Sequence, residues 1–193
     1  MGAYGIQYLD RIDSVTNETD IIFMDMKNQV KNIVHAYRHF LQDLNGSNVF
    51  EKLLSTAARF TDADRATIFI DPKYNSPDQN HKLKAILATG LKNSEIVVDI
   101  EHGIVGHVFR TKQSYFTNDV QKDPHFYAGI DKQTGYKTKS TMAVPLWFKN
   151  QSPIGVLQVL NNKQEMFTEN DLLILELLSI FSTMALDYLN NLE

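Results

Sequence analysis

Residues 141–160 read TMAVPLWFKNQSPIGVLQVL, and this stretch decides the class of fold. Two runs rich in apolar and β-branched residues, Thr141–Phe148 and Ile154–Leu160, flank a polar turn at Asn150–Pro153. Runs of this kind, separated by Asn, Ser and Pro, are typical of neighbouring antiparallel strands joined by a hairpin. The stretch therefore predicts two adjacent strands of one sheet.

Four further strand-like runs lie upstream of this pair. They are Arg65–Ile70, Leu83–Ala88, Glu95–Ile100 and Tyr115–Asn118. Together the six runs predict one antiparallel sheet. A short helix entered through glycine is expected at 103–109. The polar connection Asp119–Ser140 has the length of a lid or a binding loop, because structureless loops this long are uncommon in compact domains.

Helical periodicity precedes the strands. Apolar residues over 22–44 recur by threes and fours, which predicts a long helix close to a coiled-coil seam. Asn48 and Glu51 are spaced as a capping box and predict the start of a second helix, which runs to about Phe60.

A last helix is predicted from about Glu169 to Leu192, preceded by a capping box of Thr168 and Asp171. Its apolar residues form two stripes: Leu173, Leu177, Ile180 and Met184 make one, and Leu178, Phe181, Ala185 and Leu192 make the other. One sheet buries only one stripe. A second partner is therefore expected, either the helix at 22–44 or its copy in another subunit, and we predict a homodimer through 22–44 and 172–192.

These elements predict an α+β fold, a six-stranded antiparallel sheet with helices on both sides, preceded by a long helix. We expect residues 1–20 to be a flexible arm, 21–46 a connecting and dimerisation helix, and 47–193 a single domain that includes the last helix.

Composition excludes several classes of function. The 193 residues carry a formal charge of -4 without a Lys/Arg block, which makes nucleic acid an unexpected partner. There is no cysteine, so thiol nucleophiles, zinc-thiolate sites and covalent chromophore attachment through sulfur are absent. No signal-peptide core or membrane span is visible, and a cytoplasmic protein is expected. The six histidines lack metal-ligand spacing, and no catalytic motif is present, so neither an enzyme nor a metal site is predicted.

Four short motifs carry a resemblance to a known family. They are Gly103-Ile104-Val105-Gly106-His107-Val108, Asp123-Pro124-His125-Phe126, Asp131 followed by Thr134-Gly135-Tyr136-Lys137-Thr138, and Ile154-Gly155-Val156-Leu157-Gln158. In this order and spacing the chain resembles the GAF domains of cyclic-nucleotide phosphodiesterases and cyanobacterial-type adenylyl cyclases, over about 48–192. The resemblance implies a non-catalytic regulatory domain that binds cAMP or cGMP and signals to a covalently linked effector domain outside this chain.

The resemblance also assigns a set of ligand-binding positions. They are Thr67, Ala88 and Thr89 toward the base and ribose, Ile104, Val105, Ile130 and Asp131 as backbone donors at helix starts near the phosphate, Thr134 and Thr138 near the ribose-phosphate, and Gln158 at the base. The alternative to a ligand-binding role for these threonines is that they are ordinary strand residues or are solvated in a loop. Ala88 stands where some relatives carry a stacking Phe, which either lowers the expected affinity or shifts that contact to Phe126 or Tyr127.

The position of Gln158 makes it a candidate site residue independently of the resemblance. It lies in an otherwise apolar strand, on the face of Ile154, Val156 and Leu160 by two-residue alternation. A buried amide needs partners, so it either bonds to backbone in the core or reads a ligand's base at the floor of a pocket. Because Gln158 and Thr89 are neutral where some cGMP-selective relatives carry carboxylates, we expect a cAMP preference of roughly 1–3 kcal/mol.

Two alternatives stay open. The family's Asn-Lys…Phe…Asp-Glu signature is matched at Asn161, Phe167 and Asp171, but Asn162 replaces the Lys, with Lys163 one place later, and Leu172 replaces the final Glu. This departure puts the family's Lys–Asp ion pair in question and favours a dimerisation module without nucleotide binding. The other alternative is a domain that senses a different small molecule, such as a noncovalent tetrapyrrole or a metabolite.

Overall fold

The computed structural model describes residues 21, 24–25, 27–40, 42, 48–72, 82–89, 96–148, 152–164 and 166–190, with the backbone alone at 148, 152 and 183–190. The chain divides into two units, 1–35 and 36–193. In the first unit the described residues are helical, and Met24, Val30 and Val34 are exposed. The expected arm at 1–20 lies outside the described residues.

The second unit is built on one six-stranded sheet, as the sequence predicts. Its strands are β1 (Ala63–Ile70), β2 (Lys82–Ala88), β3 (Val97–Asp99), β4 (Tyr115–Thr117), β5 (Thr141–Phe148) and β6 (Ser152–Asn162). They lie in the order β3-β2-β1-β6-β5-β4, and every neighbouring pair is antiparallel. The hairpin of β5 and β6 pairs Val144 with Leu157, and β1 lies against the other side of β6.

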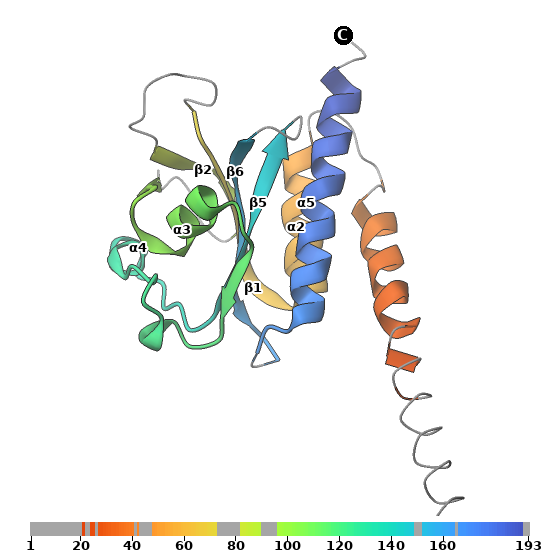
Figure 1. Ribbon diagram of the computed structural model, residues 1–193, viewed down its shortest axis with the longest axis horizontal. Helices are drawn as coiled ribbons and strands as arrows, with labels where there is room; N and C mark the ends of the chain where they lie inside the picture. The colour runs from red at the N-terminus through yellow and green to blue at the C-terminus, as the bar shows by residue number, and fades with distance from the viewer. Residues whose placement is uncertain are drawn as a thin grey trace, which may run out of the picture. The chain divides into compact units, whose positions relative to one another are not determined.

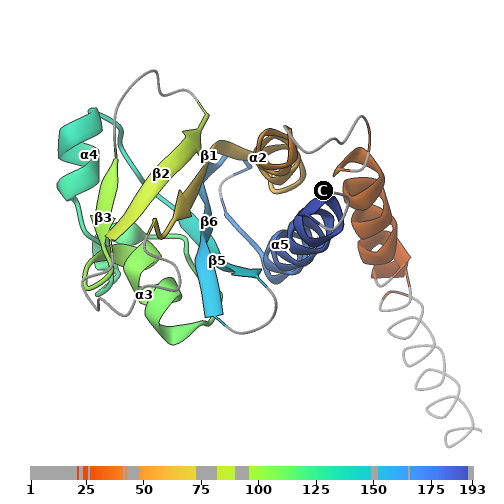
Figure 2. The same cartoon turned by 90° about the horizontal axis from the view of Figure 1, so that it is seen from above.

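Helices cover both faces of this sheet (Figures 1 and 2). The helices α2 (Val49–Phe60) and α5 (Glu169–Asn190) pack together on one face, against β1 and β5. The helix α3 (Gly103–Thr111) lies on the other face, followed in the chain by a short 3-10 helix (Val120–Lys122) and by α4 (Gly129–Thr134). The last two form within the expected binding loop.

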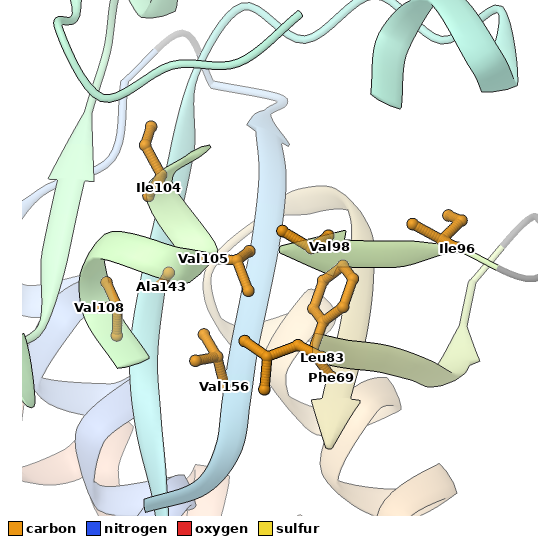
Figure 3. Packing of buried hydrophobic residues seen from close by; sticks show 9 residues of the cluster. All are labelled: Phe69, Leu83, Ile96, Val98, Ile104, Val105, Val108, Ala143 and Val156. Carbon is orange, nitrogen blue, oxygen red and sulfur yellow. The ribbon is translucent and has the colours of Figure 1, made fainter. Parts of the chain in front are cut away.

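Strand alternation divides the core between the two faces. On the α2/α5 side the sheet presents buried Ala66, Ile68, Leu157 and Val159. On the α3 side lies a cluster of Phe69, Leu83, Ile96, Val98, Ile104, Val105, Val108, Ala143 and Val156 (Figure 3). This cluster holds α3 against β5 and β6, so the start of α3 is fixed over the centre of the sheet.

The two predicted capping boxes have different outcomes. At α5 the box forms, because the Thr168 N–H and hydroxyl both donate to Asp171 at 2.8 Å while the Asp171 N–H donates to Thr168 Oγ1 at 3.3 Å. At α2 the helix begins after Asn48 and ends at Phe60 as predicted, but the capping box is wrong, since the Asn48 side chain makes no capping hydrogen bond. The Asn48 carbonyl still accepts the first helical bond, from Lys52.

The last helix has a partner that the sequence did not indicate. Its buried residues Ile174, Leu175 and Leu178 lie where α5 packs against β5 and α2, and of these three only Leu178 belongs to an expected stripe. Tyr37, which lies in the helix expected at 22–44, contacts Phe181 of the second stripe, with ring centroids 4.5 Å apart, so one of the two expected partners is found at this residue. In the other stripe Leu173 and Ile180 are exposed, so this surface stays available for the predicted dimer.

Candidate ligand-binding site

A cavity of about 80 Å³ lies between the sheet, α3 and α4. It is lined by Arg65, Thr67, Phe69, Ile96, Val98, Gly103, Ile104, Val105, Phe126, Tyr127, Ile130, Asp131, Thr134, Tyr136, Thr138, Thr141, Gln158 and Leu160. Apolar side chains make up most of the wall, and a few polar groups converge on it. This combination is typical of a small-molecule site.

The floor of the cavity carries an amide whose orientation is fixed. Gln158 Nε2 lies 3.0 Å from Thr141 Oγ1, and the Thr141 hydroxyl donates its single proton to the Val159 carbonyl at 3.2 Å. Thr141 Oγ1 therefore accepts from the Gln158 amide nitrogen. The Gln158 carbonyl oxygen is left with no hydrogen-bond partner among the described residues, so the residue that lines the cavity keeps an unused acceptor.

The wall opposite the floor is the first turn of α3. Gly103 enters the helix at φ +75°, a conformation that side chains disfavour, and His102 before it makes no capping hydrogen bond through its side chain. Gly103, Ile104 and Val105 line the cavity. Because the first amides of a helix lack partners within the helix, this turn offers hydrogen-bond donors and a positive dipole end to an anion.

The lid, α4 and the segment that follows it, is closed by its own side chains. Asp131 accepts from the Thr138 N–H and from the Thr138 hydroxyl, each at 2.7 Å. Thr134 donates to the Ile130 carbonyl at 2.9 Å, within its own helix. Three of the expected ligand-binding side chains thus satisfy one another or their own backbone.

A cationic group stands at one end of the cavity. The Arg65 guanidinium lies over the Tyr136 ring, 3.9 Å from its centroid. The Tyr136 hydroxyl donates to Asp64 at 2.7 Å. Burial, and then the hydrogen bond to Asp64, raises the pKa of Tyr136 above its ordinary value, so this hydroxyl remains a donor across the physiological range. A cation over an aromatic face is favourable, and it holds Arg65 toward the cavity.

Eight of the ten expected residues line the cavity: Thr67, Ile104, Val105, Ile130, Asp131, Thr134, Thr138 and Gln158. Ala88 and Thr89 do not line it. Thr89 extends the pairing of β2 with β1, because its hydroxyl accepts from the Ala66 N–H at 2.8 Å. Phe126 and Tyr127, the expected replacements for a stacking Phe, do line the cavity.

Sequence reasoning missed Arg65 and Tyr136. Strand alternation was the available signal for Arg65, because residues 65, 67 and 69 share one face of β1 and Thr67 was already a candidate. Tyr136 stood in a quoted motif, but its partner Asp64 lies 72 residues away, and no local pattern reveals that pairing.

The family's ion pair is not formed by its nearest candidates here. Lys163 is exposed, and no ion pair joins it to Asp171 in the described part of the chain, because the Asp171 carboxylate caps α5 instead. Asn162, which replaces the family's Lys, donates to the Thr61 carbonyl at 2.9 Å.

A histidine pair adjoins the cavity wall. The rings of His107 on α3 and His125 in the following loop stack with centroids 3.8 Å apart, and Tyr115 lies edge-on to both. The Tyr115 hydroxyl and the backbone N–H of His125 both donate to the Asp123 carboxylate. Burial, then the nearby His125 and Arg110, lowers the pKa of His107, an effect that Asp123 opposes. No group of three metal-binding side chains is present among the described residues.

Comparison with known proteins gives the same fold and family as the sequence. Residues 45–186 match the GAF domain family. The chain is 27% identical over 151 residues to the probable 3′,5′-cyclic phosphodiesterase pde-5 of Caenorhabditis elegans, and 27% identical over 172 residues to the dual 3′,5′-cyclic-AMP and -GMP phosphodiesterase 11A of Takifugu rubripes. These matches cover 72% and 85% of this chain but only 20% and 19% of the relatives. The chain thus spans about a fifth of their length.

Solved structures support the fold alone. The GAF domain of a phosphoenolpyruvate-protein phosphotransferase from Coxiella burnetii superposes with a TM-score of 0.69 at 13% identity, covering 86% of this chain and 96% of that one. The free methionine-R-sulfoxide reductase of Neisseria meningitidis superposes with a TM-score of 0.67 at 13% identity, covering 86% and 92%. Among the described helices, none has the length and apolar character needed to cross a membrane.

Proposed function

Because this chain belongs to the GAF domain family, we propose that it is a regulatory module that binds a 3′,5′-cyclic nucleotide, with cAMP preferred to cGMP. Its relatives over most of this chain are cyclic nucleotide phosphodiesterases, and they are about five times longer than the matched part. The module then passes its bound state to an effector domain outside the described chain.

The observation that carries the proposal is the Gln158 amide at the cavity floor. Its nitrogen is held by Thr141, its oxygen has no hydrogen-bond partner among the described residues, and the residue lines the cavity. The adenine edge offers an exocyclic amine that donates to this oxygen, and the neighbouring Thr67 hydroxyl can donate to the adjacent ring nitrogen. A neutral amide and a hydroxyl thus complement adenine.

Arg65 does not decide between the two bases. A guanidinium only donates, and it can donate to O6 and N7 of guanine as well as to the ring nitrogens of adenine. No acidic side chain other than Asp131 lines the cavity in the described part of the chain, and its carboxylate is occupied by Thr138. A guanine-selective site would gain from a free carboxylate, which accepts from both guanine donors.

The cyclic phosphate fits the first turn of α3. It carries one negative charge, and the amides of Ile104 and Val105 at this turn supply donors with a positive dipole end. The backbone amides of Ile130 and Asp131 are expected to contribute less to phosphate binding than those of α3, because α4 has only six residues.

A second candidate function is a GAF dimerisation module that binds no nucleotide. The bonds of Asp131 to Thr138 favour it, because they use groups that a ligand would otherwise engage. Mass spectrometry of small molecules released from the purified protein separates the two. A released cyclic nucleotide supports the proposal. A different released compound argues for the sensing of another small molecule, and an empty protein that also ignores added nucleotide supports the dimerisation module.

A further inference from the structure

The last residue but one of β6 has an unusual backbone. Asn161 has φ +53°, in the left-handed region that few residues besides Gly, Asn and Asp adopt readily. This conformation turns the side chain out of the strand and toward the lid segment 136–140, where all of its hydrogen bonds are made.

The Asn161 side chain uses both ends of its amide. Its oxygen accepts from the N–H groups of Lys139 and Ser140, at 2.7 and 3.2 Å. Its nitrogen donates to the Lys137 carbonyl and to the Tyr136 hydroxyl, both at 2.9 Å. One side chain thus holds the whole length of the segment that leads from the lid helix into β5.

Tyr136 extends this connection to β1, the strand that neighbours β6. Its hydroxyl, which accepts from Asn161, donates to Asp64 on β1, and its ring lies under Arg65. Both Tyr136 and Arg65 line the cavity. The lid segment is therefore bound at once to the end of β6 and to the start of β1, the two central strands of the sheet.

We propose that Asn161 and Tyr136 form a clasp that holds the lid over the cavity, and that ligand exchange requires this clasp to open. The clasp consists of neutral hydrogen-bond donors and acceptors and of one carboxylate, that of Asp64. It therefore holds the lid closed without an ion pair between Lys163 and Asp171. Asn161 is a positioning residue: it lies outside the cavity lining and acts through Tyr136 and the backbone. The role in ligand exchange rests on the proposed function, whereas the clasp itself does not.

Three variants test the clasp without ligand. Asn161→Gly removes the side chain but tolerates the left-handed backbone. Asn161→Asp keeps the acceptor for Lys139 and Ser140 but loses both donated bonds. Tyr136→Phe keeps the ring against Arg65 and removes the hydroxyl. Lys163→Ala is the matched control, since Lys163 lies two residues away and is exposed.

Hydrogen exchange of the ligand-free protein is the first readout. Exchange at the amides of 137–140 should accelerate roughly tenfold or more in Asn161→Gly and less in the other two variants, because fewer bonds are lost. The exchange of β1 and β6 should stay as in the wild type, and Lys163→Ala should change neither. Unchanged exchange at 137–140 in both Asn161→Gly and Tyr136→Phe, or an equal rise over the whole domain, would overturn the clasp.

The dissociation rate of cAMP is the second readout. It should rise several-fold in Asn161→Gly and Tyr136→Phe and stay unchanged in Lys163→Ala. Equal dissociation rates in all four proteins would refute the role in ligand exchange. If the wild type binds neither cAMP nor cGMP, the proposed function fails, and the role of the clasp in ligand exchange fails with it. Amide hydrogen exchange at 137–140 still decides whether the clasp exists.

Discussion

Asp131 on α4 accepts two hydrogen bonds from Thr138, one from its N–H and one from its hydroxyl, each 2.7 Å long. Thr138 is buried and Asp131 is half-buried. The pair fixes α4 on the polypeptide that enters β5, so that the lid is closed on itself in the structure described. Hydrogen bonds to a carboxylate are stronger than neutral ones, and this pair is expected to contribute to stability.

Replacing Asp131 by Ala should therefore lower the free energy of unfolding by about 1–3 kcal/mol, the usual value for charged hydrogen bonds to a partly buried group. Urea denaturation measures the change. Gln133→Ala, on the same helix but exposed, is the control and should leave the stability near that of the wild type. A wild-type midpoint for Asp131→Ala would show that the two bonds contribute nothing net.

Gln158→Glu tests which base is read. A carboxylate at the cavity floor accepts from guanine N1–H and N2–H₂, so any preference for cAMP should narrow or reverse, by roughly 1–3 kcal/mol. Competition binding of the two nucleotides measures it. Gln133→Glu introduces the same charge on the exposed side of α4 and should leave the preference unchanged. A preference that shifts equally in both variants would mean that charge alone, and not the floor position, decides.

The positions of the six strands and the hairpin formed by the last two were predictable because strands leave a local pattern. Alternation placed Gln158 on the same face of its strand as Leu160, and both line the cavity. The bounds shifted only slightly, as with β6, which begins at Ser152 and ends at Asn162 instead of spanning Ile154–Leu160. The register within a sheet depends on which face is buried, and the apolar residues of that face can be recognised in the sequence.

Contacts between distant side chains were not predictable. The resemblance assigned ligand contacts to the Asp131 backbone and to Thr134 and Thr138. In the structure the Asp131 side chain binds Thr138, and Thr134 binds the Ile130 carbonyl. Asn48 has the sequence of a helix cap without the bond. Whether a polar side chain serves a ligand or another residue depends on geometry that composition and spacing do not encode.

Acid should destabilise the domain through His107. Burial and the neighbouring His125 and Arg110 lower its pKa below the ordinary 6.5, so the unfolded chain binds more protons than the folded one between the two values. The free energy of unfolding should thus be constant on this account above pH 6.5 and fall as the pH decreases below it. His39, whose pKa is also lowered, mainly by burial, adds to the slope.

His107→Gln should flatten this dependence, and His35→Gln, at an exposed helical position, should not. Denaturation at a series of pH values on both sides of 6.5 provides the measurement. If His107→Gln keeps the full wild-type slope, the stacked pair does not control acid stability.

The predicted dimer can be tested on the exposed stripe of α5. Leu173 is 40% exposed and Ile180 48% exposed, one above the other at a spacing of seven residues. Replacing either by Glu should convert a dimer to a monomer in light scattering, because a charge would be buried at the interface. Ile86→Glu, at a comparably exposed site on β2, should leave the dimer intact. A wild-type chain that stays monomeric at tens of micromolar would refute the dimer.

Isothermal titration of the purified chain with cAMP and with cGMP tests the central claim most directly. The account predicts that both nucleotides compete for one site, that cAMP binds more tightly, and that Thr67→Val and Gln158→Leu weaken it by about 1–3 kcal/mol each, since each removes a polar partner at the cavity floor. Absence of heat and of any melting shift with either nucleotide at millimolar concentration would contradict it.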